Sequence, residues 1–179
     1  HTRYGTVTGV QTCALPIYPD EQFLIQSGKR LFKGMDDYND LHRMQFDLET
    51  EGLLPSKHAV FQIGIRTNRG FERVLEIQGS MPQERRDSER EIIKQFFEII
   101  NELKPDIISG YNSENFDWAF LHERCQRLSI NIKDIAITLS PSSKIRRKSA
   151  SLKLGGERES YEQTYMFGYN ILDISHAVR

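Results

Sequence analysis

Two acidic residues, Asp47 and Glu49, lie two positions apart in the segment RMQFDLET, where apolar and polar residues alternate. This alternation predicts a β-strand, and residues two apart in a strand project from the same face. Two carboxylates on one face repel each other and are costly to desolvate, so a cation beside them stabilises the pair. Oxygen-only ligands favour hard ions such as Mg²⁺ or Mn²⁺. A solvated edge strand is the alternative that the pair by itself leaves open.

A second group of candidates lies in the segment GYNSENFDWAF, from Gly110 to Phe120. The apolar run before it predicts a short buried strand, and a helix is predicted to begin near Asp117. An acid in the first turn of a helix is favoured by the helix dipole, so a capping role is one interpretation of Asp117. Strand ends of α/β sheets are also where sites assemble. There Asn112 is able to bond a base, sugar or phosphate, and Phe116 to stack on a terminal base.

The elements that must position these residues follow from hydrophobic periodicity. Strands are predicted at 43–50, 59–66 and 71–77, with a hairpin signal at Asn68-Arg69-Gly70. A helix begins near Pro82, with Glu84 in its first turn, and carries a buried stripe as far as Leu103. A strand at 106–110 and a helix at 115–128 follow. The order predicts an α/β fold with a ribonuclease H-like mixed sheet: a three-strand antiparallel meander, then helix, strand and helix.

The remaining segments are less regular. Gln22–Phe32 is predicted as one strand and 34–40 as a loop. The polar, basic stretch 138–151 is predicted as a loop, with a hairpin around Gly155-Gly156 formed by 152–154 and 161–167. Asn170–Ile174 is apolar and is predicted as a buried strand.

The two candidate segments together resemble the Exo I and Exo II motifs of family B DNA polymerases, which read F-D-[IL]-E-T and Y-N-x-x-x-F-D. The resemblance covers roughly residues 30–179 and implies a 3′→5′ proofreading exonuclease domain of the DEDD type. It implies that Asp47, Glu49 and Asp117 are three of the four catalytic, metal-binding carboxylates. It also places Asn112 and Phe116 where the family contacts the DNA primer end.

The fourth carboxylate has two possible positions. The family's Exo III motif is Y-x-x-x-D on a helix, and Tyr169 to Asp173 fits those letters. However, Ile171, Leu172 and Ile174 are typical of a buried strand. The alternative puts the fourth ligand beyond Arg179, so that the domain is truncated at its C-terminus.

The resemblance implies two divalent ions, Mg²⁺ or Mn²⁺, that act in hydrolysis of the 3′-terminal phosphodiester bond. The implied partners are the single-stranded 3′ end of a primer and a polymerase domain in the same full-length chain. One alternative is a free-standing DEDD exonuclease that acts on RNA or single-stranded DNA. Another is a non-catalytic exonuclease-like scaffold, whose usual mark is a lost carboxylate; Asp47, Glu49 and Asp117 are all present.

Composition narrows the remaining classes of protein. The net charge is −1, so no overall basic field indicates nucleic acid, although acidic metal ligands would offset a basic groove. A local basic cluster, Lys144, Arg146, Arg147 and Lys148, is either a solvated loop or a contact for DNA phosphates. No cysteine pair indicates a zinc site. No apolar run approaches the ~20 residues of a membrane helix, so we expect no membrane association. The expected location is the cytoplasm, with nucleoid association in a bacterium.

The N-terminal tract VTGVQTCALPI, Val7–Ile17, resembles a translated sequencing-library adapter. Residues 1–17 are therefore interpreted as a non-native segment, and 18–179 as a partial exonuclease domain.

Overall fold

The structure is a computed structural model that describes residues 19–28, 37–140, 142–154 and 157–178. The predicted boundary at residue 17 and the adapter-like tract before it lie outside these residues. The described residues divide into two units, one that ends at Asp40 and one that begins at Leu41.

Helix α2 (Pro19–Ser27) and the short 3₁₀ helix η1 (Tyr38–Asp40) are the described elements of the first unit. The prediction of a strand at Gln22–Phe32 is therefore wrong over its first part, and 29–32 lies outside the described residues. Proline at the first position favours a helix start, and Gly28 follows the last turn with φ 62°. These end signals outweigh the mixed apolar pattern, because Phe23 and Ile25 are exposed rather than packed against a sheet.

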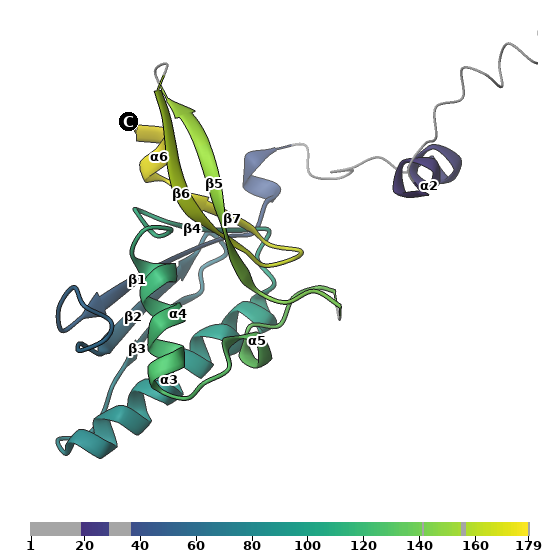
Figure 1. Ribbon diagram of the computed structural model, residues 1–179. Coiled ribbons are helices and arrows are strands. Elements are labelled where there is room, and N and C mark those ends of the chain that lie inside the picture. The colour runs from purple at the N-terminus through teal and green to yellow at the C-terminus, as the bar shows by residue number, and fades with distance from the viewer. Residues whose placement is uncertain (1–18, 29–36, 141, 155–156, 179) are drawn as a thin grey trace, which may run out of the picture. The chain divides into compact units, whose positions relative to one another are not determined.

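A five-stranded mixed sheet forms the centre of the second unit (Figure 1). The strand order is β3-β2-β1-β4-β7, with β1 antiparallel to β2, β2 antiparallel to β3, and β4 parallel to both β1 and β7. The strands are β1 (Arg43–Thr50), β2 (Val60–Thr67), β3 (Glu72–Glu76), β4 (Ile107–Gly110) and β7 (Asn170–Asp173). The predicted meander, the following strand and the strand at the C-terminal end are confirmed.

Helix α3 (Pro82–Leu103) packs on β2 and β3, and α4 (Asp117–Arg127) and α5 (Ile132–Ile135) contact α3. The short helix α6 (Ser175–Val178) follows β7, and its His176 ring lies 4.5 Å from the Tyr161 ring of the segment 157–165. Helix α3 begins at Pro82, where the Glu84 carboxylate accepts the backbone N–H of Met81 at 3.1 Å, and it ends at Lys104, which has a left-handed backbone. The core is centred on Phe46 of β1, Phe96 of α3 and Trp118 of α4, with the Phe46 ring 4.9 Å and 5.0 Å from the other two. This cluster fixes β1 against the start of α4.

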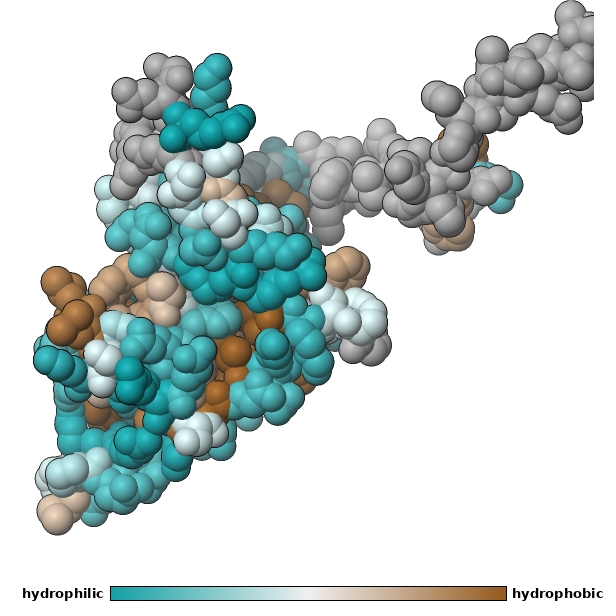
Figure 2. Space-filling view, in the orientation of Figure 1, coloured by the Kyte–Doolittle hydropathy of each residue, from teal (hydrophilic) through white to brown (hydrophobic). Residues whose placement is uncertain are grey.

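A two-stranded hairpin, β5 (Arg146–Leu154) and β6 (Glu157–Tyr165), forms a separate sheet. The prediction of a loop at 138–151 is wrong from Arg146 onwards, and the predicted hairpin is longer than expected. A two-stranded ribbon that projects from the core has no continuous buried face, so its strands lack the alternation on which the prediction depended. The visible face of the hairpin is mainly hydrophilic (Figure 2).

Candidate active site

Strand β1 presents Asp47 and Glu49 on its exposed face, while Phe46 and Leu48 are buried on the other. The register pairs Asp47 with Gly64 and Glu49 with Gln62 of β2. Glycine opposite Asp47 leaves open space beside the carboxylate, because a Cβ added at Gly64 would meet no atom within 4 Å. The alternation predicted from the sequence is confirmed, and both acids are accessible from one side of the sheet.

Strand β4 ends at Gly110, and the chain then turns through residues Tyr111–Phe116, here named the Asn112 turn. A Cβ on Gly110 would lie 2.7 Å from Cβ of Ser113 and 3.3 Å from the Phe46 carbonyl oxygen, so only glycine allows this close approach. Asn112 has a left-handed backbone, φ 58°. That conformation costs on the order of 1 kcal/mol for a residue other than glycine, so the surroundings must hold the turn in place.

Asp117 is the first residue of α4, and it is the most buried of the three predicted ligands, with 2% of its surface exposed. Strand β4 pairs with β1 only as far as Gln45, and beyond that point Oδ1 of Asp117 accepts the backbone N–H of Leu48 at 3.2 Å. The next residue, Trp118, is fully buried in the aromatic cluster. The core therefore fixes the carboxyl of Asp117 against β1.

The ionised form of Asp117 is destabilised. Its pKa is raised to about 7, first by burial and then by the charge of Asp47; the backbone N–H of Leu48 opposes both, and Asp173 adds a smaller raising effect. A bound cation would reverse this, because it stabilises both carboxylates in their charged forms. The charge of Asp47 thus acts directly on Asp117, which lies 70 positions further along the sequence.

The donor chemistry fits a hard divalent cation, since Asp47, Glu49 and Asp117 offer oxygen alone. Among the residues that the structure describes, no three His, Cys, Asp or Glu side chains already form a cluster that could hold an ion. The charge of Asp47 acts on Asp117, and Glu49 projects from the same face of β1 as Asp47.

Asn112 and Phe116, the predicted DNA contacts, lie at the two ends of the Asn112 turn. The Asn112 side chain accepts a hydrogen bond from Nδ2 of Asn115 at 3.1 Å. The Phe116 ring is half-buried and packs against Phe120, with 5.4 Å between ring centroids. Part of each side chain is accessible, on the segment that leads directly into Asp117.

Asp173, one of the two candidates for the fourth ligand, lies at the end of β7 opposite Gly110, on a strand and not on a helix. It is 8% exposed, and its carboxylate accepts three backbone N–H groups, those of Asn112, Glu114 and Ser175, at 2.8, 3.0 and 2.9 Å. Burial acts to raise the pKa of Asp173. The three N–H groups and the nearby Ser175 hydroxyl outweigh burial and hold this pKa below its ordinary value. The Ser175 hydroxyl itself lies outside hydrogen-bonding geometry.

Glu114 is a residue of the turn whose role no sequence pattern indicated. Its carboxylate is 1% exposed and accepts the backbone N–H and the hydroxyl of Thr164 on β6, the latter at 2.8 Å. Arg147 of β5 lies 3.6 Å from the same carboxylate and donates to the Glu114 carbonyl at 2.7 Å. Burial raises the pKa of Glu114, against the effects of Thr164 and Arg147. The hairpin is thereby tied to the Asn112 turn.

The side chains of the predicted basic cluster point in two directions. Strand alternation turns Arg147 inward, whereas Lys144, Arg146 and Lys148 are exposed. Arg146 and Lys148 each lie 6.0 Å from the centroid of the Tyr165 ring.

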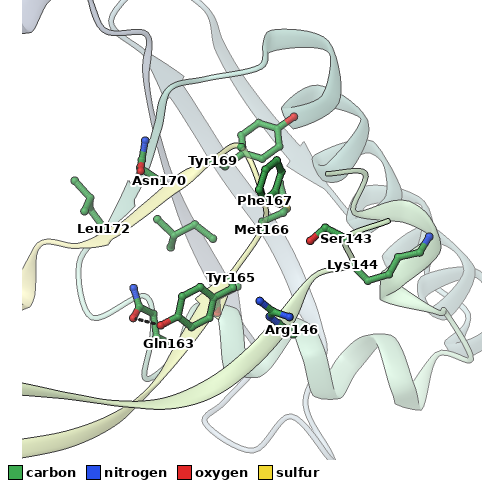
Figure 3. Close-up of a pocket in the computed structure, with 13 residues that line it drawn as sticks. Ser143, Lys144, Arg146, Gln163, Tyr165, Met166, Phe167, Tyr169, Asn170 and Leu172 are labelled. Atoms are coloured by element: carbon green, nitrogen blue, oxygen red, sulfur yellow. Dashed lines mark hydrogen bonds between the residues drawn. The ribbon is translucent and has the colours of Figure 1, made fainter. Parts of the chain in front are cut away.

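A pocket of about 320 Å³ lies between the base of the hairpin and β7 (Figure 3). Arg146 and Tyr165, register partners on β5 and β6, line it together with Lys144, Phe167 and Leu172. The Tyr165 hydroxyl donates to Gln163 at 2.9 Å. None of Asp47, Glu49 and Asp117 lines this pocket, so it is separate from the carboxylate site.

Comparison with known proteins points to one family. A profile described as "DNA polymerase family B, exonuclease domain" matches residues 18–179. The DNA polymerase of Thermococcus kodakarensis is 30% identical over 115 residues, which are 62% of this chain and 7% of that protein. The DNA polymerase of Archaeoglobus fulgidus is 32% identical over 98 residues, 52% of this chain and 11% of that protein. The chain thus spans a small part of the length of these relatives.

A solved structure agrees with the fold. The family B DNA polymerase of Pyrobaculum calidifontis matches with a TM-score of 0.50 and 22% identity, over 75% of this chain and 15% of that one. The mixed sheet is that of a ribonuclease H-like fold, as predicted. In the described part of the chain, no helix is long and apolar enough to span a membrane.

Proposed function

Because the chain belongs to the exonuclease domain family of family B DNA polymerases, we propose that it hydrolyses the 3′-terminal phosphodiester bond of DNA with Asp47, Glu49 and Asp117 as its metal-binding carboxylates. The observation that carries the proposal is the environment of Asp117. This acid is buried at the start of a helix, is held against β1, and has a pKa raised to about 7 by burial and by Asp47. A carboxyl whose pKa is strongly raised by burial and by a neighbouring charge is typical of catalytic sites.

The cofactors of this proposal are two divalent ions, Mg²⁺ or Mn²⁺, held by Asp47, Glu49 and Asp117. When bound, such ions supply Lewis-acid activation of water and stabilise the departing 3′ oxygen. The protein itself positions the three carboxylates. Asp117 stays fixed by Leu48 and Trp118, and Asp47 and Glu49 project from a strand that is rigid on its buried face. The site is therefore built on regular elements and not on loops.

The proposed substrate is a single-stranded 3′ end. Asn112 would bond the terminal nucleotide and Phe116 would stack on its base, since both lie on the segment that leads into Asp117. An unpaired terminus reaches such a site at a lower unpairing cost than a paired one, which is the basis of selection for mismatched ends. We infer that a polymerase domain in the same full-length chain supplies these ends, and that the reaction takes place in the cytoplasm, where DNA is replicated.

The test uses single-stranded DNA labelled at either end, on this chain and on a longer chain that continues past Arg179. The expected result is stepwise release of mononucleotides from the 3′ end that requires Mg²⁺ or Mn²⁺ and stops with a chelator. Asp47→Ala should abolish release. Asp87→Asn, an exposed acid on α3, is the matched control and should leave the rate unchanged. Release from the 5′ end, or release that persists in chelator, would show that the proposal is wrong.

A further inference from the structure

The carboxylate of Asp173 lies directly beneath the Asn112 turn. Its strand, β7, runs parallel to β4 with Asp173 opposite Gly110, so the two strands end at the same level. The Ile174 N–H donates to the Gly110 carbonyl at 2.9 Å and continues the pairing past both ends. Side chains at the end of β7 therefore lie beside the residues that follow β4.

Three backbone N–H groups converge on this one side chain. Oδ1 of Asp173 accepts from Asn112 at 2.8 Å and from Ser175 at 2.9 Å, and Oδ2 accepts from Glu114 at 3.0 Å. A carboxylate has about four lone-pair positions, so three are already used. Asp117, in contrast, accepts one backbone N–H from outside its own helix, that of Leu48. The two acids have opposite hydrogen-bonding environments.

The Asn112 turn depends on these bonds. The Glu114 N–H is buried and the Asn112 N–H is partly buried, and the Asp173 carboxylate accepts both. A buried backbone N–H without a partner is costly, so the loss of this acceptor would destabilise the turn.

We propose that Asp173 is a positioning residue that holds the Asn112 turn in its functional conformation, and that it is not a metal ligand. The inference rests on the function proposed above, in which this turn presents Asn112 and Phe116 to the 3′ end. It decides between the two positions that the sequence leaves open for the fourth ligand, by removing Asp173 from that role.

The first experiment measures hydrogen exchange of the full 179-residue chain with Asp173→Asn. Asparagine keeps one acceptor oxygen, and its NH₂ group must face a backbone N–H. We expect exchange in residues 111–116 to accelerate at least tenfold, with residues 92–100 of α3 unchanged. Asp106→Asn is the matched control: Asp106 accepts the His42 N–H at 2.7 Å just before the start of β4, so residues 111–116 should not respond. Unchanged exchange in 111–116 of the Asp173 variant overturns the proposal.

The second experiment measures Mn²⁺ affinity of the same chains by calorimetry. Asp173→Asn should bind Mn²⁺ within threefold of the unaltered chain, whereas Asp117→Asn should bind at least tenfold more weakly. A tenfold loss in the Asp173 variant would make it a ligand and refute the inference. If Asp117→Asn and Asp47→Asn both leave Mn²⁺ binding unchanged, the proposed function fails, while hydrogen exchange still decides the role of Asp173.

A measurement on the unaltered chain covers the case in which Asp173→Asn does not fold. The Asn112 and Glu114 amides should be protected at least 100-fold without metal, relative to the amide of exposed Ser56. Exchange at the rate of the Ser56 amide overturns the proposal.

Discussion

The carboxylates on the two sides of the Asn112 turn have opposite surroundings. On one side, Asp117 accepts the Leu48 N–H and is close enough to Asp47 for the two charges to repel. On the other side, Asp173 accepts three backbone N–H groups, and Glu114 accepts the N–H and hydroxyl of Thr164 beside Arg147. Asp117 therefore accepts one hydrogen bond from outside its own helix, whereas the Asp173 and Glu114 carboxylates each accept several.

We expect this difference to separate acids that bind metal ions from acids that maintain the fold. A buried carboxylate that already has its donors gains little from a cation, whereas one beside another carboxylate gains a great deal. Both kinds are required here, because the turn that carries Asn112 connects the two. Four predictions can break or sharpen this comparison.

The largest effect is expected from Asp117→Asn. The substitution removes a charge that the proposed cations need but keeps the size of the side chain, so nuclease activity should fall by ~10²-fold or more. Release of 3′-terminal nucleotides measures it, in the longer chain if the 179-residue chain is slow. Glu123→Gln, a partly exposed acid on the same helix, should retain full activity. An active Asp117→Asn variant would mean that the two kinds of acid do not differ in function.

Glu114→Ala should have the next largest effect, on stability. It leaves Arg147 without its buried partner and the Thr164 N–H without an acceptor, at a cost of about 3 kcal/mol. Chemical denaturation measures the loss. Glu162→Ala, on the same strand as Thr164, is an exposed control and should change stability by less than about 0.5 kcal/mol. A loss as small as that of the control would show that the hairpin is not held through Glu114.

Local sequence patterns predicted the parts of the site whose cause is local. Asp47 and Glu49 follow from alternation in a strand with one buried face, and Asp117 follows from a helix start after a buried strand. The tie between Glu114 and Thr164 spans 50 residues, and that between Asn112 and Asp173 spans 61. No periodicity indicates which distant strand end a turn will meet, so these partners required the structure.

The wrong secondary-structure predictions also arose because local sequence does not show which segments pack together. The loop predicted at 138–151 becomes strand from Arg146 because pairing with β6 stabilises it, and such a ribbon needs no apolar alternation. The described part of the strand predicted at Gln22–Phe32 lies in helix α2 and the turn at Gly28, and its apolar residues Phe23 and Ile25 are exposed. Asp173 was predicted on a strand, and this is confirmed; what that strand lies beside was not visible in the sequence.

The third prediction concerns pH. The pKa of Asp117 is raised from 3.8 to about 7, so the folded state holds this proton more tightly than the unfolded state. Its contribution to stability is complete below about pH 4 and is lost as pH rises to about 7. In chelator at pH 8, Asp117→Asn should therefore melt a few degrees above the unaltered chain, corresponding to roughly 1–2 kcal/mol. The difference should vanish near pH 4, and added Mn²⁺ should stabilise only the unaltered chain. A difference that does not vary with pH would contradict the raised pKa.

The smallest effect is expected from the basic residues of the hairpin, where cations divide as the carboxylates do. Arg147 donates to the Glu114 and Glu162 carbonyls and to the Thr164 hydroxyl, so it is committed to the fold. Arg146 and Lys148 are exposed beside Tyr165, and we expect them to contact phosphates. Arg146→Ala and Lys148→Ala should each weaken binding of single-stranded DNA a few-fold at low salt and lower the slope of log affinity against log salt by roughly 0.7.

Fluorescence anisotropy with a short labelled strand measures the affinity and the slope. Lys94→Ala, an exposed lysine on α3, should leave both unchanged. Arg147→Ala should instead lower the melting temperature, because it removes the partner of a buried acid. If Arg146→Ala and Lys148→Ala leave the salt slope unchanged, their outward direction reflects solvation alone. The division between cations that bind and cations that support the fold would then not hold on the hairpin, while the division between the carboxylates would be unaffected.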